Sequence, residues 1–313
     1  MAIRNGKYTI NFDGDDFAEQ AVEQPTTEPE AVIGHSGSGL HFASFGSGSS
    51  GNCSFIGNER AGIIVDAGID PDYVFENLKR NGIDPARIAG VLLTHDHSDH
   101  VRYAYKIMRA YKHMQIYCTP KLLNALLRNH NLSRRIKDYH HPIFKEIPFK
   151  VAGMQVTAFD TSHDAGDNMG FFIETSGGNF VVATDMGVIT ERAEYYMRQA
   201  HYLMIESNYD RHMLDTGRYP EFLKARVRGE RGHLDNDVAA EFVATRCHCA
   251  KYVFLCHLSN DNNTPEIALD KMRRALEGAG LTVGDAGNAI DQRDRDIQLY
   301  ALPRHEMSTW FPL

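Results

Sequence analysis

The chain alternates short apolar runs with stretches in which apolar positions recur at helical spacing. Two of the helical stretches open with a capping residue followed by proline, at Thr119-Pro120 and Thr264-Pro265. The predicted strands are 41–45 and 53–56, a hairpin around a Gly/Ser-rich loop, and then 63–66, 88–93, 115–118, 154–159, 179–185, 202–205, 251–257 and 296–301. The other predicted helices are 71–79, 101–114, 220–227 and 237–247. This order suits an α/β fold, a four-layer αβ/βα sandwich with two sheets face to face and helices outside.

The densest cluster of polar residues follows the predicted strand 88–93 and reads Thr94-His95-Asp96-His97-Ser98-Asp99-His100. Imidazoles and carboxylates are ligands that suit Zn, Mn or Fe. His95 and His97 alternate, so both can face the same side of an extended segment. Asp99 and His100 lie where the helix 101–114 is expected to begin, within reach of a second metal. The alternative is a solvated polar loop. Further ligands elsewhere in the chain would favour the metal site over this alternative.

Such partners follow three other predicted strands. His163 follows strand 154–159, Asp185 ends strand 179–185, and His257 ends strand 251–257. A single His or Asp after a strand is usually a turn or capping residue. The recurrence of a strand followed by a ligand therefore predicts a shared metal site.

In this order, the residues Val65-Asp66-Ala67-Gly68, the histidine tract, His163, Asp185 and His257 resemble the metallo-β-lactamase superfamily, over about residues 40 to 260. Four further phrases resemble the YycJ/WalJ branch of its hydrolases, and they lie at 46–53, 206–210, 232–236 and 257–263. That branch usually has Ser at the position of Asp235, and Asp caps a helix equally well.

The resemblance implies two divalent metal ions, Zn, Mn or Fe, with a bridging hydroxide as the nucleophile. His95, His97 and His163 would hold the first ion, Asp99, His100 and His257 the second, and Asp185 would bridge them. Asp66 would support a histidine ligand, or else cap a turn before Gly68.

The complete histidine tract favours phosphodiester hydrolysis, because β-lactamase members of the superfamily usually lack its last histidine. Related phosphodiesterases deliver a proton to the leaving oxygen with a Glu–His pair, which Glu206 and His233 would form here. The alternative places His233 in a helix-entry loop and Glu206 at a strand end. The YycJ/WalJ resemblance implies a 5′→3′ exonuclease acting on DNA. Its main rival is a small-molecule hydrolase of the same fold, such as a lactonase, a thioesterase or a cyclic phosphodiesterase.

The charge is unevenly distributed along a chain whose formal net charge is −8. Residues 8–40 hold seven acidic residues and no Lys or Arg, so we expect 1–39 to be a flexible acidic extension and 40–313 to be the hydrolase domain. Between Arg211 and His233, six basic residues oppose three acidic ones.

Arg226, Arg228 and Arg231 of this basic segment are candidate contacts for substrate phosphates, with a solvated face as the alternative. A second basic cluster comprises Arg128, Arg134, Arg135 and Lys137. Ser49 and Asn52 of the Gly/Ser-rich loop are further candidate substrate contacts, unless this loop is a plain hairpin turn.

The rest of the composition excludes other classes of protein. The 313 residues are 42% hydrophobic, enough for one large domain, and no apolar run approaches the ~18 residues of a membrane span. The N-terminus has no secretory signal pattern, and five cysteines do not suggest a disulfide framework. We therefore expect a cytoplasmic protein, and the sequence leaves its oligomeric state open.

Overall fold

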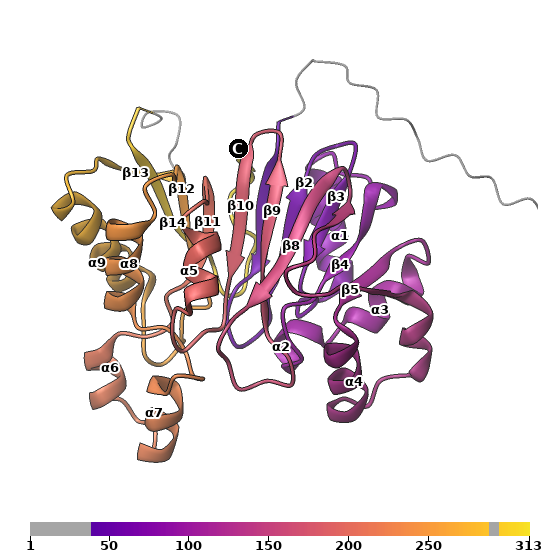
Figure 1. Ribbon diagram of the computed structural model, residues 1–313, viewed down its shortest axis with the longest axis horizontal. Coiled ribbons are helices and arrows are strands. Elements are labelled where there is room, and N and C mark those ends of the chain that lie inside the picture. The colour runs from indigo at the N-terminus through magenta and orange to yellow at the C-terminus, as the bar shows by residue number, and fades with distance from the viewer. Residues whose placement is uncertain (1–38, 288–293) are drawn as a thin grey trace, which may run out of the picture. The chain divides into compact units, whose positions relative to one another are not determined.

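Two β-sheets packed face to face form the centre of the computed structural model, which describes residues 39–287 and 294–313 (Figure 1). Within the described residues the first sheet has seven strands, in the order β15-β1-β2-β3-β4-β5-β6. They are β1 (His41–Gly46), β2 (Cys53–Gly57), β3 (Gly62–Val65), β4 (Ile88–Leu92), β5 (Gln115–Cys118), β6 (His140–Pro142) and β15 (Phe311–Pro312). The acidic extension predicted for 1–39 lies outside the described residues, apart from Gly39.

The second sheet has eight strands among the described residues, in the order β13-β14-β12-β11-β10-β9-β8-β7. They are β7 (Phe149–Val151), β8 (Met154–Asp160), β9 (Met169–Thr175), β10 (Gly178–Ala183), β11 (Tyr202–Glu206), β12 (Tyr252–Cys256), β13 (Val283–Asp285) and β14 (Ile297–Ala301). The strands β10, β11, β12 and β14 run parallel, so their carboxyl ends meet at one edge.

Helices cover the outer faces of both sheets (Figure 1). The first sheet is covered by α1 (Pro71–Arg80), α3 (Ala104–Ala110) and α4 (Pro120–Asn129), and the second by α5 (Glu191–Met197), α8 (Asn236–Arg246) and α9 (Pro265–Gly278). The shorter helices are α2 (Ser98–Val101), α6 (Arg211–Thr216) and α7 (Glu221–Arg228), with 3₁₀ turns η1 (Pro85–Arg87) and η2 (Arg134–Tyr139). The predicted four-layer αβ/βα sandwich is confirmed.

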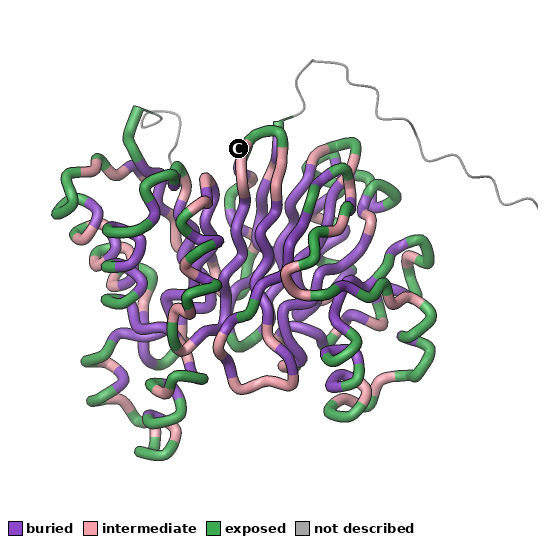
Figure 2. Tube along the Cα trace, viewed as in Figure 1, coloured by how far each residue is buried: buried purple, intermediate pink, exposed green. Residues whose placement is uncertain are grey.

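Local sequence explains most of these elements. The apolar runs are buried along most of their length in the inner layers, as Figure 2 shows. Phe42 of β1 packs across the sheets against Phe180 and Phe254, with ring centroids 5.0 and 4.5 Å apart. Thr119 and Thr264 cap α4 and α9 through their side-chain oxygens, as the Thr-Pro pairs predict.

One predicted helix differs from the structure in a way that shapes the site. The pattern predicts a continuous helix over 101–114, whereas α2 ends at Val101 and α3 spans Ala104–Ala110. The backbone N–H of Tyr103 donates to Ala67 O at 2.8 Å, and Ala67 N–H donates to His100 O at 2.6 Å. The turn after β3 therefore forms hydrogen bonds with the N–H of Tyr103 and the C=O of His100, backbone groups that would bond within a continuous helix.

The described helices are all too short or too polar to cross a membrane. The five cysteines all lie in the described part of the chain, and each is free. This agrees with the expectation that the cysteines form no disulfide framework.

Candidate active site

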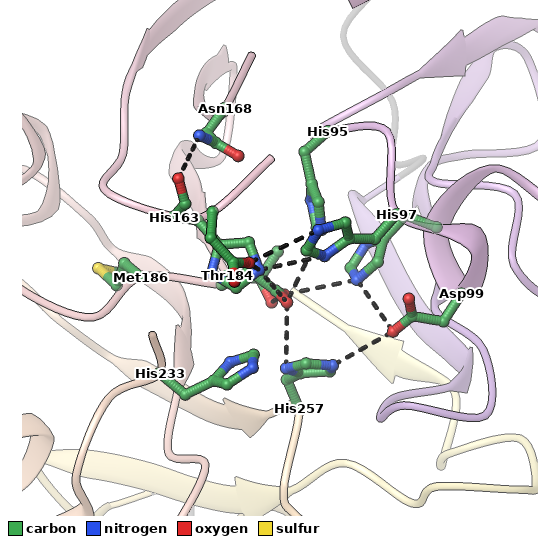
Figure 3. Close-up of polar contacts among 12 residues, drawn as sticks. His95, His97, Asp99, His163, Asn168, Thr184, Met186, His233 and His257 are labelled. Carbon is green, nitrogen blue, oxygen red and sulfur yellow. Dashed lines mark hydrogen bonds and ion pairs between the residues drawn. The ribbon is translucent and has the colours of Figure 1, made fainter. Parts of the chain in front are cut away.

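The predicted ligands lie in loops that follow the carboxyl ends of strands from both sheets. From the first sheet, Asp66 follows β3 and the histidine tract follows β4. From the second sheet, His163 lies three residues beyond β8, Asp185 follows β10 and His257 follows β12. Figure 3 shows the side chains of His95, His97, Asp99 and His257 turned toward one another across this edge of the sandwich.

Three of these residues have left-handed backbone conformations that only glycine adopts readily. The φ angles are 61° at Asp66, 50° at Asp185 and 53° at His257. Such conformations cost free energy and persist where the surrounding structure enforces them, typically at functional sites. Here they turn each side chain sharply out of its strand direction at the point where the strand ends.

One cluster of ligand atoms comes from His95, His97 and His163, whose ligand atoms all lie within 4.8 Å of one another. His163 Nδ1 lies 2.8 Å from the carbonyl oxygen of Gly232 and donates to it, so Nε2 remains free to face the cluster. His95 is buried, and its Nε2 atom has no hydrogen-bond partner. A buried imidazole nitrogen without a partner is costly, and a metal ion would satisfy it.

A second cluster comes from Asp99, His100 and His257, whose ligand atoms also lie within 4.8 Å of one another. His100 Nδ1 lies 2.7 Å from Asp66 Oδ2, which fixes the tautomer and leaves Nε2 for coordination. The buried Nε2 of His257 likewise has no hydrogen-bond partner and lies 3.4 Å from Asp99 Oδ2. These donors fit a divalent cation of the Zn, Mn or Fe type.

Asp185 lies between the two clusters. Its Oδ2 atom is 3.8 Å from His95 Nε2 and 3.7 Å from His163 Nε2, and its Oδ1 atom is 3.5 Å from His100 Nε2. Burial alone would raise the pKa of Asp185, but His257, His100 and the other imidazoles hold it well below its usual range. The carboxylate is therefore ionised and available to cations on either side.

The surrounding carboxylates and imidazoles shift two of the histidines in opposite directions. Burial lowers the pKa of His100, but Asp185 and Asp66 outweigh burial and raise it to about 9. Burial, together with nearby His100, holds the pKa of His95 well below its usual range. His95 is thus neutral at pH 7, the form that coordinates metal.

Glu206 is fully buried and contacts both a metal-cluster histidine and His233. Its Oε1 atom lies 2.7 Å from His233 Nδ1 and 3.0 Å from His257 Nδ1. Its Oε2 atom accepts the backbone N–H groups of Met186 and Leu234 at 2.8 and 3.2 Å. Burial would raise the pKa of Glu206, but His233 lowers it, so the carboxylate stays ionised.

The resemblance to related phosphodiesterases implies the Glu206–His233 pair but not the contact of Glu206 with His257. That contact follows from the register of two strands, because β11 and β12 are parallel neighbours in which Glu206 pairs with Cys256, the residue before His257. Asn208 was also missed, and its side-chain amide donates to His257 O at 2.7 Å.

Asp96 fastens the loop that carries the histidine tract. Asp96 is buried, and it accepts from Asn129 Nδ2 at 2.6 Å and from the backbone N–H of Gly166 at 2.7 Å. His130 Nε2 lies 2.5 Å from its backbone carbonyl oxygen. These contacts tie the end of α4 and the loop after His163 to the loop that carries His95 and His97.

The three arginines predicted to bind substrate lie in different environments. Arg226 Nε donates to Asp164 Oδ2 at 2.6 Å, and Asp164 Oδ1 lies 3.6 Å from His97 Nε2. Arg231 donates twice to the carbonyl oxygen of His163, at 3.2 Å each. Arg228 instead pairs with Asp215 at 2.7 Å, within the α6–α7 segment.

The two candidates in the Gly/Ser-rich loop also differ from each other. Ser49 is exposed at the tip of the loop. Asn52 is buried, exchanges hydrogen bonds with the backbone of Gly48 at 2.9 and 3.0 Å, and donates to Asp99 Oδ2 at 3.2 Å. Its amide is thus committed to closing the hairpin against a ligand-cluster residue, which differs from the expected substrate contact.

Comparisons with known proteins identify the family. Residues 62–258 match the model of the beta-lactamase superfamily domain. The chain is 32% identical over 250 residues to exodeoxyribonuclease YycJ of Bacillus anthracis, covering 79% of this chain and 93% of that protein. It is 31% identical over 248 residues to exodeoxyribonuclease WalJ of Streptococcus pneumoniae, covering 79% of this chain and 91% of that one.

Among solved structures, the metallo-β-lactamase fold protein YhfI from Bacillus subtilis superposes with a TM-score of 0.61 at 13% identity, over 86% of this chain and 99% of that chain. The chain therefore belongs to the metallo-β-lactamase superfamily and, within it, to the family of the YycJ and WalJ exodeoxyribonucleases. It is a metal-dependent hydrolase of that fold.

Proposed function

We propose that this protein is a dinuclear metal-dependent phosphodiesterase that degrades DNA as a 5′→3′ exonuclease. The observation that carries the proposal is the contact of Glu206 with His233, 2.7 Å long, directly beside the two ligand clusters. The family relatives named exodeoxyribonuclease support DNA as the substrate. The 5′→3′ polarity rests on the resemblance to the YycJ/WalJ branch.

His95, His97 and His163 would hold one metal ion, and Asp99, His100 and His257 the other, with Asp185 shared between them. When bound, a pair of divalent ions supplies a water nucleophile activated at neutral pH and neutralises the negative charge of the phosphate. Asp66 keeps the His100 ring oriented through the 2.7 Å contact to Nδ1.

His233 is placed to deliver a proton to the leaving oxygen of the phosphodiester. Its ring centroid lies 4.9 Å from that of His163 and 5.2 Å from that of His257, so it borders both ligand clusters. Glu206 accepts from Nδ1 of His233, which leaves Nε2 as the atom that gives up the proton. A negative partner at Nδ1 also stabilises the protonated imidazole that the reaction needs.

Arg226 and Arg231 are the proposed contacts for backbone phosphates, because both lie against the loop that carries His163. The guanidinium of Arg226 is 56% exposed and keeps both of its terminal nitrogens for a ligand while its Nε atom bonds to Asp164. Arg228 is left out of the proposed contacts, because it pairs with Asp215 of α6, whereas the partner of Arg226 lies beside His163.

The small-molecule rival would require a closed, apolar pocket beside the ligand clusters. The described cavity that borders His163 has a volume of about 280 Å³ and is lined by charged and polar groups, including Lys121, Lys145, Asp160 and Arg231. This lining favours a phosphate-bearing substrate over an apolar acyl compound.

The proposal is tested by a panel of substrates incubated with Mn, with Zn and without metal. The panel holds DNA and RNA labelled at either end, bis-(p-nitrophenyl) phosphate and a thioester. We expect stepwise release of nucleotides from the 5′ end of DNA, only when metal is present. Rapid hydrolysis of the thioester with intact DNA would overturn the proposal in favour of the small-molecule hydrolase.

A further inference from the structure

The outer face of α7 carries an aromatic side chain that the fold leaves uncovered. Phe222 is 76% exposed, more than any other large apolar side chain of the described residues. On the opposite face, Val227 packs against Tyr209 and Leu214, and Lys224 Nζ donates to Asp215 O at 2.7 Å. These contacts fix which face of the short helix is inward, so Phe222 is held outward by the packing of its neighbours.

Arg226 connects the exposed face of α7 to the ligand clusters. Phe222 and Arg226 are four residues apart and therefore lie on the same helix face, about 6 Å apart along the axis. Arg226 bonds to Asp164, whose other carboxylate oxygen lies 3.5 Å from His163 Nε2. Figure 1 shows α6 and α7 lying beyond the sheet edge at which the ligand-bearing strands end.

The segment that carries Phe222 is rich in basic residues. From Arg218 to Arg231 it contains five basic residues and two acidic ones, in a chain of net charge −8. Lys224 and Arg228 pair with Glu221 and Asp215, whereas Arg218 is exposed and Arg226 bonds to Asp164 through Nε and keeps its terminal nitrogens. Exposed aromatic rings among cationic groups are what proteins use to hold single-stranded nucleic acid, because the ring stacks on a base while the cations contact the phosphates. An acidic protein partner would also be attracted by these basic residues. Charge attraction alone does not explain why an aromatic ring is exposed among them.

We propose that Phe222 stacks on a nucleobase of the strand end that enters the site, and so favours ends that are unpaired or fray easily. The inference rests on the proposed exonuclease function and names the part of the substrate that α7 recognises. Stacking of one base on an aromatic ring tightens binding roughly 5- to 150-fold. Phe222 is a positioning residue in this scheme, because it contacts a base and not the reacting phosphate.

The test uses the full chain with its metals and a DNA whose terminal bases include 2-aminopurine, joined by hydrolysis-resistant phosphorothioate linkages. Fluorescence of 2-aminopurine falls when it stacks on an aromatic ring. We expect Phe222→Ala to lose this quenching and to bind the DNA end roughly 5- to 150-fold more weakly. Phe222→Trp should keep both properties.

The matched control is Tyr195→Ala. Tyr195 is also exposed, at 55%, but it lies on α5 against the outer face of the second sheet, and the guanidinium of Arg192 lies 5.3 Å from its ring centroid. Its replacement should change neither quenching nor affinity. Unfolding temperatures of all variants are measured in parallel, so a folding defect would be seen directly.

Three outcomes separate the possibilities. Unchanged quenching and affinity in Phe222→Ala, with DNA still degraded by the parent, would overturn the stacking proposal and leave the proposed function standing. A parent protein that neither binds nor degrades DNA would overturn both. A change of oligomeric state in Phe222→Ala, with normal DNA quenching, would mean that this face contacts a second copy of the chain, which also overturns stacking.

Discussion

At the scale of single residues, the contact between Glu206 and His233 makes a prediction about the leaving group. His233 lies outside the proposed ligand set, so His233→Ala should keep its metal content. Its turnover on DNA should fall roughly 10²–10⁴-fold, the usual contribution of a general acid. The loss should be smaller on bis-(p-nitrophenyl) phosphate, because nitrophenolate leaves without a proton. The measurement is the turnover number on both substrates, with metal content determined on the same sample.

Glu206→Gln provides the companion variant. A glutamine can still accept from His233 Nδ1, but its amide nitrogen would then face the backbone N–H groups of Met186 and Leu234 that Glu206 Oε2 accepts. Turnover should therefore fall through loss of the negative charge and of these two hydrogen bonds. If His233→Ala loses turnover equally on DNA and on bis-(p-nitrophenyl) phosphate, His233 has a structural role and does not protonate the leaving group.

At the scale of elements, the turn after β3 and the short helix α2 touch so closely that only glycine fits between them. A Cβ atom on Gly68 would lie 1.6 Å from the carbonyl oxygen of Asp99 and 2.6 Å from Asn52 N. Gly68→Ala must therefore push α2 away, which we expect to destabilise the protein by at least ~1–3 kcal/mol and to weaken metal binding at Asp99 and His100. Denaturant unfolding and metal titration measure the two effects.

The control for this prediction is Gly278→Ala at the end of α9. A Cβ atom there would meet nothing within 4 Å, so this variant should be neutral or slightly more stable. If Gly68→Ala unfolds and binds metal as the parent does, the packing of α2 on the β3 turn is not what positions the ligands.

Elements that depend on neighbouring residues were predictable, and those that depend on distant backbone contacts were not. Thr119 and Thr264 mark the starts of α4 and α9 in the sequence, because an N-cap residue acts on the first turn of its own helix. The break between α2 and α3 depends on Ala67, a contact that no periodicity records. Likewise the pairing register of β11 with β12 brings Glu206 beside His257, and the sequence contains no signal for register. The residues of the candidate site were therefore foreseeable, whereas the contacts among them required the fold.

At the scale of the whole molecule, the proposed DNA substrate is a polyanion, and a chain with net charge −8 would need a local basic surface to bind it. Each phosphate contact releases counterions, so the logarithm of the affinity for duplex DNA should fall with the logarithm of salt concentration by about 0.9 per contact. Arg226→Ala should reduce this slope by about one contact. Arg228→Ala on the same helix should leave the slope nearly unchanged, because the partner of Arg228 is Asp215 of α6, whereas Arg226 bonds to Asp164 beside His163. Binding isotherms across a range of salt concentrations decide between the two arginines. Identical slopes for the parent and for Arg226→Ala would mean that Arg226 lies on a solvated face and contacts no DNA phosphate.

The central claim is that two metal ions share Asp185 in one hydrolytic site, and metal content measured together with DNA degradation tests it most directly. Asp270→Ala is the control, because Asp270 is an exposed aspartate of α9 that pairs with Arg274. We predict about two divalent ions per chain in the parent and in the control, and loss of both the ions and the 5′-end degradation in Asp185→Ala. An Asp185→Ala protein that keeps its full metal content and degrades DNA as the parent does would contradict the account.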